Sequence, residues 1–230
     1  MAQPPSRRSK PGEIDKFLSR SKHLVQRARS GARLIFAIDA TASRQPTWDQ
    51  ACQIQGQMFL STHGLGGLAV QLCYYRGFSE LRASKWLLDE TALLRQMSAV
   101  RCEGGYTQIE RLLNHALKEH ENEPVKALVF IGDAMEENPD TVCGKAGQAG
   151  IQGLPLFMFQ EGHDPAVEHT FKTMARLSGG AYARFDHNSA AELAELLGAV
   201  ARYAAAGRSG LLEYGTEASA GVKLLLQQLK

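Results

Sequence analysis

The sequence predicts a Rossmann-like, doubly wound α/β fold in which helices cover both faces of a mostly parallel, six-stranded sheet. The first observation is that runs such as 34–38 and 127–131 are apolar at every position or nearly so, as in strands buried on both faces. The second is that segments with helical spacing of apolar residues separate these runs, and such alternation is typical of a parallel sheet. A chain of 230 residues with 44% hydrophobic content can also form a substantial core.

The individual elements follow from local patterns along the chain. Apolar runs predict strands at 34–38, 68–75, 81–84, 127–131, 156–159 and 182–185. Amphipathic spacing predicts helices at 47–62, 90–98, 107–119, 141–149, 166–177 and 190–205. The capping-box spacing of Thr47 and Gln50 places the start of the first of these helices at Thr47. Gly104 and Gly105 mark a turn before the third of them.

The chain divides into a basic N-terminal arm and helix (1–30), a central domain (31–205) and a C-terminal tail (206–230) with the leucine spacing of a short helix. The first 33 residues hold nine Lys/Arg against two acidic residues, and a helix is expected at about 13–29. Such an arm could contact nucleic acid through salt-dependent interactions. The net charge of only +2 and the absence of an accompanying aromatic set favour a solvated tail and a packing helix instead.

The compartment expected from the sequence is the cytoplasm. No apolar run approaches the roughly 20 residues needed to span a bilayer, and the first residues lack the apolar centre of a secretory signal. The four cysteines are widely spaced and form no CxxC pair, so we expect free thiols in a reducing compartment and no zinc knuckle.

Two of the predicted strands end in an aspartate. The strand at 34–38 runs into Asp39, and the strand at 127–131 runs through Gly132 into Asp133. In doubly wound sheets, ligands bind at the carboxyl ends of the strands where the strand order reverses, and in the common order that point lies between strands 1 and 4. The two carboxylates are therefore expected to converge on one crevice. Each aspartate taken alone would also suit a turn or a helix cap.

The segment that follows the first strand carries an oxygen-bearing side chain at every second position. Asp39, Thr41 and Ser43 alternate with two alanines, so a turning backbone could aim three oxygens in one direction. Carboxylate and hydroxyl oxygens are hard ligands, which suit Mg²⁺ or Mn²⁺ better than Zn²⁺ because no His or Cys takes part. The same hydroxyls could instead satisfy backbone groups of the loop.

These residues resemble the metal-ion-dependent adhesion site of the von Willebrand factor A (VWA) family, whose pattern is Asp-x-Ser-x-Ser followed by a Thr and then an Asp. Asp39, Thr41 and Ser43 match the first element, with Thr41 in place of the first Ser. Thr107, which follows two glycines, matches the threonine, and Asp133 matches the last aspartate. The resemblance covers about residues 31–205.

The resemblance implies a non-enzymatic module for binding other proteins. The three hydroxyls would coordinate the metal directly, the two aspartates would act largely through water, and a carboxylate from a partner protein would complete the coordination. Bacterial intracellular members of the family often serve as adaptors beside ATPases or chaperones, so a partner of that kind is expected. Arg44 and Tyr106 flank the motif, where they could line the partner surface or be solvated.

The alternative from a different class is a magnesium-dependent phosphohydrolase or phosphotransferase of Rossmann-like fold. Such enzymes place a nucleophilic aspartate at the end of the first strand, where this chain has Asp39. Against this alternative, Thr41 stands where a second acidic residue would be needed, and Gln160 stands where a receiver domain would have a lysine. Glu136 and Glu137 are expected in a solvated loop or helix start, or else to add negative potential near the metal.

Overall fold

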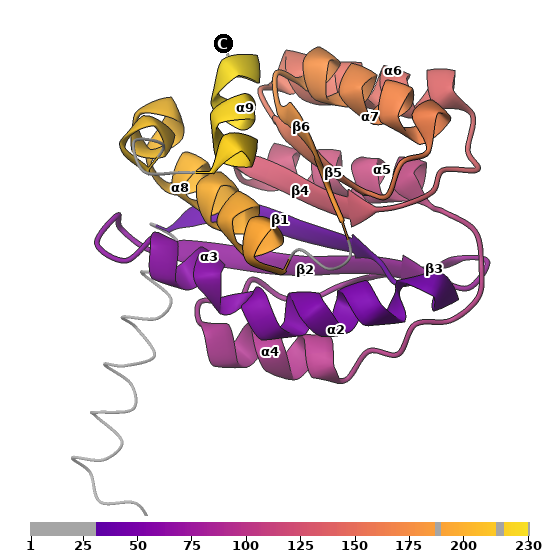
Figure 1. Cartoon of the computed structure of the whole chain (residues 1–230), viewed down its shortest axis with the longest axis horizontal. Helices are drawn as coiled ribbons and strands as arrows, with labels where there is room; N and C mark the ends of the chain where they lie inside the picture. The colour runs from indigo at the N-terminus through magenta and orange to yellow at the C-terminus, as the bar shows by residue number, and fades with distance from the viewer. Residues whose placement is uncertain (1–30, 187–189, 215–218, 230) are drawn as a thin grey trace, which may run out of the picture.

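A computed structural model of the chain, which describes residues 31–186, 190–214 and 219–229, contains one six-stranded sheet in the order β3-β2-β1-β4-β5-β6 (Figure 1). The strands are β1 (Ala32–Asp39), β2 (Leu68–Arg76), β3 (Glu80–Ala83), β4 (Ala127–Gly132), β5 (Leu156–Glu161) and β6 (Ala181–Phe185). All neighbours are parallel except β2 and β3, which are antiparallel. The predicted fold class is therefore confirmed. The helix predicted at 13–29 lies outside the described residues.

The strand order reverses between β1 and β4, as the sequence predicted. β1 pairs with β2 on one side and with β4 on the other, and the chain first moves outward to β3 before it returns to β4. β1 is buried on both faces because Phe36 and Ile38 pack into one core cluster while Ile35 and Ala37 pack into the other. This two-sided burial explains its uninterrupted apolar run.

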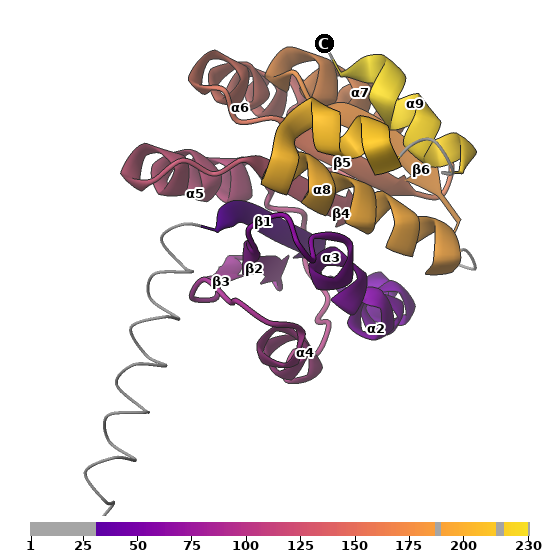
Figure 2. The same cartoon turned by 90° about the vertical axis from the view of Figure 1, so that its left-hand side faces the viewer.

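Helices cover both faces of the sheet (Figure 2). They are α2 (Gln45–Ile54), α3 (Gly56–Ser61), α4 (Glu90–Ser98), α5 (Ile109–Asn122), α6 (Pro139–Gln152), α7 (Pro165–Ser178), α8 (Ala190–Tyr214) and α9 (Ala220–Gln228). One core cluster joins the sheet to α2, α3, α4, α8 and α9, and the other joins it to α5, α6 and α7. No helix in the described part of the chain is long and apolar enough to cross a membrane.

The helix predicted at 47–62 differs from the structure in both its start and its continuity. α2 begins at Gln45, with Pro46 in its first turn, and its N-cap Arg44 makes no side-chain capping bond. Thr47 is a buried residue inside the helix, where its hydroxyl donates to the Glu161 carboxylate. The capping-box prediction was wrong because a tertiary contact, and not a local cap, holds the threonine hydroxyl.

The C-terminal residues pack against the edge of the sheet. α8 is broken at Gly207, whose φ of 66° is left-handed, and α9 follows. Leu225 and Leu229 of this tail lie in the same core cluster as α8. Gln228 exchanges two hydrogen bonds with the backbone of Tyr182 (both 2.9 Å), so its side-chain amide covers part of the β6 edge as a neighbouring strand would.

The packing of α6 against α7 predicts opposite effects for two glycine substitutions in α6. A Cβ at Gly150 would lie 2.2 Å from the Leu177 carbonyl oxygen, whereas a Cβ at the exposed Gly144 would meet nothing within 4 Å. Gly150→Ala should lower the free energy of unfolding by about 1–3 kcal/mol through overpacking. Gly144→Ala should raise it by roughly 0.5–1 kcal/mol, because alanine is the better helix former. Urea denaturation measures both, and equal effects would contradict the close helix–helix contact.

Candidate metal centre

Asp39 ends β1 as a fully buried carboxylate with two hydrogen-bond partners. The backbone N–H of Thr41 donates to its Oδ1 (2.7 Å), and the Tyr75 hydroxyl donates to its Oδ2 (3.3 Å). Burial raises the pKa of Tyr75 well above its usual value, and the Asp39 charge adds to this, so Tyr75 stays a protonated donor. The carboxylate is thus oriented from both sides by neutral groups.

The charge on Asp39 is only partly compensated. Burial raises the pKa of this carboxyl, hydrogen bonds from Thr41 and the charge of Arg44 lower it, and the neighbouring Asp133 raises it further. The net shift is upward, which means that the ionised form is disfavoured where it stands. A cation bound beside Asp39 would reverse this balance, because it would favour the ionised carboxylate.

Thr41 and Ser43 lie on the tight turn that follows β1. Thr41 has an extended backbone and precedes the single-turn helix η1 (Ala42–Arg44), and its hydroxyl interacts with Asp39. Ser43 is exposed, and within the described part of the chain its hydroxyl has no hydrogen bond. The Ser43 hydroxyl is therefore free to act as a ligand without losing an existing contact.

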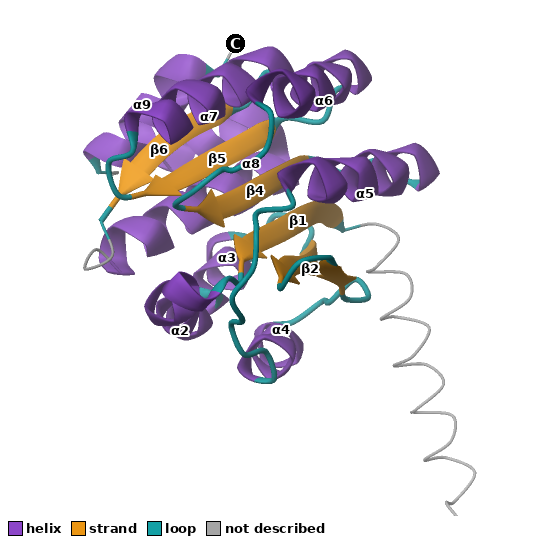
Figure 3. Ribbon diagram, turned by 90° about the vertical axis from the view of Figure 1, so that its right-hand side faces the viewer, coloured by secondary structure: helices purple, strands orange, loops and turns teal. Residues whose placement is uncertain are grey.

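Asp133 lies directly beyond β4, next to the end of β1. The two strand ends are close, since a Cβ added to Gly132 would lie 3.8 Å from the Asp39 Cβ. Asp133 Oδ2 is 3.4 Å from Arg44 Nη1, while Oδ1 is buried and has no hydrogen-bond partner. A buried, unpartnered carboxylate oxygen is costly, so this atom requires a ligand or water. Figure 3 shows the loops at this carboxyl end of the sheet.

Arg44 is a part of the site that the sequence placed wrongly at the surface. Its side chain is only 2% exposed, and it forms ion pairs with Asp133 and with Glu161 at the end of β5. Glu161 also accepts the hydrogen bond from Thr47. Three strand ends therefore bring carboxylates to one place around one buried guanidinium. Glu161 could have been found from the sequence, because it is an acidic residue at the end of a third apolar run. Nothing in the sequence pattern indicates that Arg44 is buried.

Thr107 is held in place by the loop that carries Asp133. Its N–H donates to Glu136 Oε2 (2.9 Å), and its hydroxyl oxygen accepts from the Glu136 N–H (3.0 Å). Glu137 accepts from the N–H groups of Ile109 (2.6 Å) and Glu110 (2.8 Å), which caps the start of α5. Glu136 and Glu137 lie in the expected loop before α6, and Glu136 is exposed, but their carboxylates also bind the backbone N–H groups of Thr107, Ile109 and Glu110.

The Thr107 loop is also tied to the turn after β1. The Glu103 N–H donates to the Ala40 carbonyl (3.0 Å), and the Cys102 N–H donates to Gln45 Oε1 (3.1 Å). The structure thus places Asp39, Thr41 and Asp133 together and joins Thr107 to them through Glu136. Ser43 lies on the same turn, on its exposed side.

The chemistry of these groups fits a hard divalent cation better than a soft one. The described residues contain no group of three or more His, Cys, Asp or Glu side chains that could hold a metal, so a metal here would need hydroxyl ligands. Burial raises the pKa of the nearby Cys102 thiol to about 11, with a contribution from Asp39, so no thiolate is available at neutral pH. The unpartnered Asp133 oxygen and the free Ser43 hydroxyl are the atoms such a cation would use.

The raised pKa of Asp39 predicts that this carboxylate destabilises the metal-free fold at neutral pH and is retained for metal binding. A carboxyl whose pKa is raised by folding stabilises the protein below its unfolded-state pKa and loses this contribution as pH rises through the raised value. In chelator at neutral pH, Asp39→Asn should therefore unfold at a higher temperature than wild type, and the difference should shrink in acid. Added Mn²⁺ should stabilise wild type only. Thermal unfolding across pH checks this, and a less stable Asp39→Asn protein would contradict it.

Comparison with known proteins shows similarity in structure only. No protein-family model and no curated protein matches the sequence. Among solved structures, the VWA domain of SpRpn10 matches with a TM-score of 0.55 at 13% identity, over 70% of this chain and 94% of that one. The vWF domain of the type V pili tip protein Mfa5 from Porphyromonas gingivalis matches with a TM-score of 0.57 at 11% identity, over 75% and 94%.

A third match is proximal thread matrix protein 1 from the mussel byssus, in a structure described as having a zinc-occupied MIDAS motif. It has a TM-score of 0.59 at 13% identity, over 75% of this chain and 46% of that one. These likenesses extend over most of the described sheet and helices. The chain therefore has the von Willebrand factor A fold.

Proposed function

We propose that this protein is a non-enzymatic, divalent-metal-dependent module that binds a carboxylate of a partner protein. The observation that carries this proposal is the buried and unpartnered Oδ1 of Asp133, which lies at the switch point beside the buried Asp39. A cation at this position would satisfy both carboxylates. The structure of proximal thread matrix protein 1, which has a similar fold and a zinc-occupied MIDAS motif, supports the proposal.

Five residues would hold the metal, with different tasks. Ser43, Thr41 and Thr107 would offer neutral hydroxyl oxygens, and Asp39 and Asp133 would supply the negative charge, largely through water. Bound Mg²⁺ or Mn²⁺ would supply a Lewis-acidic position that accepts an external carboxylate oxygen. The protein itself would hold these hydroxyls in position. Glu136 binds Thr107 through two hydrogen bonds, and Asp39 accepts a hydrogen bond from the Thr41 N–H.

The arrangement of acids and bases supports binding over catalysis. Thr41 stands where the acid/base residue of a phosphohydrolase would be, and its hydroxyl already faces Asp39. Glu161 is paired with Arg44 and accepts the hydrogen bond from Thr47, so it is not a free general base. Gln160 at the end of β5 is buried and bonded to the Asp164 carbonyl and the Tyr182 hydroxyl.

The proposed partner is a protein with an accessible acidic residue, in the manner of adaptors that work beside ATPases or chaperones. The proposed compartment is the cytoplasm, because all four cysteines are free thiols, as expected in a reducing environment.

A substitution at Ser43 should change the affinity for metal with little effect on the stability of the fold. Because its hydroxyl is exposed and unpaired within the described residues, Ser43→Ala should change the free energy of unfolding by less than about 0.5 kcal/mol. It should weaken Mn²⁺ binding by about tenfold or more, measured by isothermal titration calorimetry. Thr173→Ala, a hydroxyl loss on α7, is the matched control and should bind Mn²⁺ as wild type does. Unchanged affinity in Ser43→Ala would remove the serine from the site.

Thr107 should show that a hydroxyl is required and not a particular side-chain shape. Thr107→Ser keeps an oxygen for the Glu136 N–H and for the metal, so both metal binding and partner capture should persist. Thr107→Ala should lose both, with a stability cost of about 1–3 kcal/mol from the unsatisfied Glu136 N–H. The measurement is affinity capture in Mg²⁺ or in chelator, read by mass spectrometry. Capture that persists in chelator defeats the proposal, as does magnesium-dependent phosphatase turnover that Asp39→Asn abolishes.

A further inference from the structure

Two aromatic rings are exposed beside the Thr107 loop and touch each other. Phe78, at the tip of the β2–β3 hairpin, is 76% exposed, and Tyr106 is 60% exposed. Their ring centroids are 5.5 Å apart in an edge-to-face arrangement. Large rings this exposed contribute little to the core, and an exposed aromatic pair is typical of a binding surface.

The backbone under these rings is interlocked. Gly77 has a left-handed φ of 58°, and a Cβ at Gly105 would lie only 1.9 Å from the Gly77 carbonyl oxygen. The same carbonyl accepts a hydrogen bond from the Tyr106 N–H (3.2 Å). The two glycines therefore allow the hairpin tip and the Thr107 loop to touch, and this contact sets Phe78 and Tyr106 side by side.

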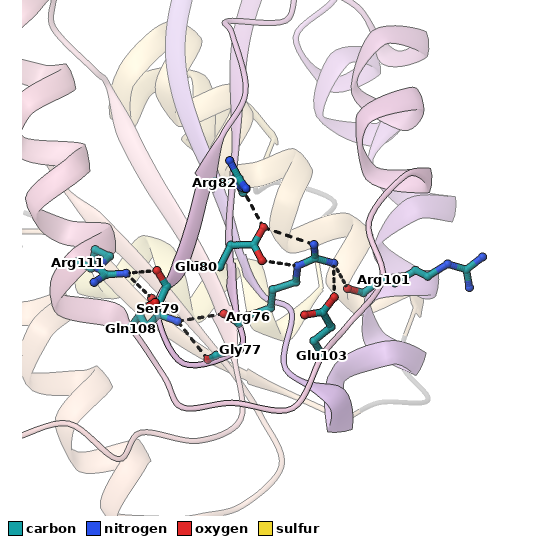
Figure 4. Close-up of polar contacts among 9 residues, drawn as sticks. All are labelled: Arg76, Gly77, Ser79, Glu80, Arg82, Arg101, Glu103, Gln108 and Arg111. Atoms are coloured by element: carbon teal, nitrogen blue, oxygen red, sulfur yellow. Dashed lines mark hydrogen bonds and ion pairs between the residues drawn. The ribbon is translucent and has the colours of Figure 1, made fainter.

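Polar contacts fix the hairpin tip to the loop and to the start of α5 (Figure 4). The Gln108 amide donates to the carbonyls of Arg76 (3.2 Å) and Gly77 (3.3 Å). Arg111 donates to the Ser79 carbonyl and to Gln108 Oε1, the latter at 3.0 Å. Arg76 donates to the Arg101 carbonyl (2.7 Å). These hydrogen bonds hold the backbone that carries the aromatic pair in place. The protein would therefore lose little conformational entropy when a ligand binds to the two rings.

Arginines lie on the hairpin, on the Thr107 loop and at the start of α5. Figure 4 shows them with two neighbouring carboxylates, namely Arg76, Arg82, Arg101, Arg111, Glu80 and Glu103. Glu80 pairs with Arg76 and Arg82, and Glu103 pairs with Arg76. Arg101 and Arg111 have no carboxylate partner among the described residues, and both are exposed. This uncompensated charge favours an anionic ligand.

We propose that Phe78, Tyr106, Arg101 and Arg111, named here the aromatic rim, form the recognition surface for an acidic peptide segment of the partner protein. The segment would place an apolar side chain against the two rings and carboxylates beside the arginines. The proposal rests on the proposed function, because Tyr106 is adjacent to Thr107 and one segment would reach both the rim and the metal.

A single-stranded nucleic acid is the less favoured ligand for this surface. The two rings meet edge to face and do not offer two parallel faces for stacked bases. A protein carboxylate instead has a place in both parts of the surface.

The test is selection of a phage-displayed library of peptides of about 12 residues on the full chain in Mn²⁺, followed by fluorescence anisotropy with the synthesised winners. Winners should carry Asp or Glu next to a large apolar residue. Phe78→Ala and Tyr106→Ala should each weaken their binding about tenfold or more. Arg101→Glu should weaken it in a salt-dependent way. The matched controls are Ile151→Ala, which alters a side chain 89% exposed on α6, and Arg208→Glu on α8, and both should bind as wild type does.

Several results would overturn the aromatic rim. These are an absence of enriched peptides, winners without acidic residues, normal binding by Phe78→Ala and Tyr106→Ala, or tighter binding of a single-stranded oligonucleotide than of any peptide. Binding that chelator and Ser43→Ala abolish but Phe78→Ala leaves intact would reject the rim and keep the metal-dependent function. Binding that depends on Phe78 and Tyr106 yet survives chelator would keep the rim and reject the metal. The exposure of both rings means that these variants should fold, which circular dichroism verifies.

Discussion

The site depends on how the fold compensates the negative charges of acidic side chains that lie at the C-terminal ends of its strands. Asp39, Asp133 and Glu161 converge there, and a buried carboxylate without a partner is strongly destabilising. Arg44 compensates Asp133 and Glu161, and it can reach them because the chain makes a tight turn directly after β1. The same turn leaves Ser43 exposed. One three-residue helical turn therefore positions Arg44 for the internal ion pairs and leaves Ser43 exposed to solvent.

A second set of contacts joins the loop that carries Asp133 to Thr107 and to the start of α5. Glu136 holds Thr107, and Glu137 caps the first N–H groups of the helix, so the loop after β4 and the start of α5 form one unit. A displacement of Thr107 would therefore break two bonds to Glu136 and disturb the cap. Any coupling of ligand binding to α5 has to exceed that cost, because a ligand shifts an equilibrium only by its difference in affinity for the two states.

The sequence was most informative where local pattern and topology agreed. Apolar runs predicted the buried strands that end in Asp39 and Asp133, and the common doubly wound order predicted that these two strand ends are neighbours, as the structure has them. The contacts of Arg44, Thr47 and Glu137 could not be predicted, because each joins residues far apart in the chain through the reach of a side chain. Thr47 illustrates the limit: its spacing suits a helix cap, yet its hydroxyl bonds to Glu161 across 114 positions of sequence.

The distribution of charge supports the proposal that this surface binds a carboxylate of a partner protein. The acidic residues at the candidate metal centre already have partners within the chain. Asp133 and Glu161 bind Arg44, and Glu136 and Glu137 bind backbone N–H groups. Their charge is therefore partly neutralised by groups of the same chain. The arginines without a carboxylate partner among the described residues are Arg101, on the Thr107 loop, and Arg111, on α5. An approaching anion would therefore be attracted by the two exposed arginines and repelled only weakly by the partly neutralised carboxylates. This balance favours the binding of an acidic segment over the hydrolysis of a small substrate.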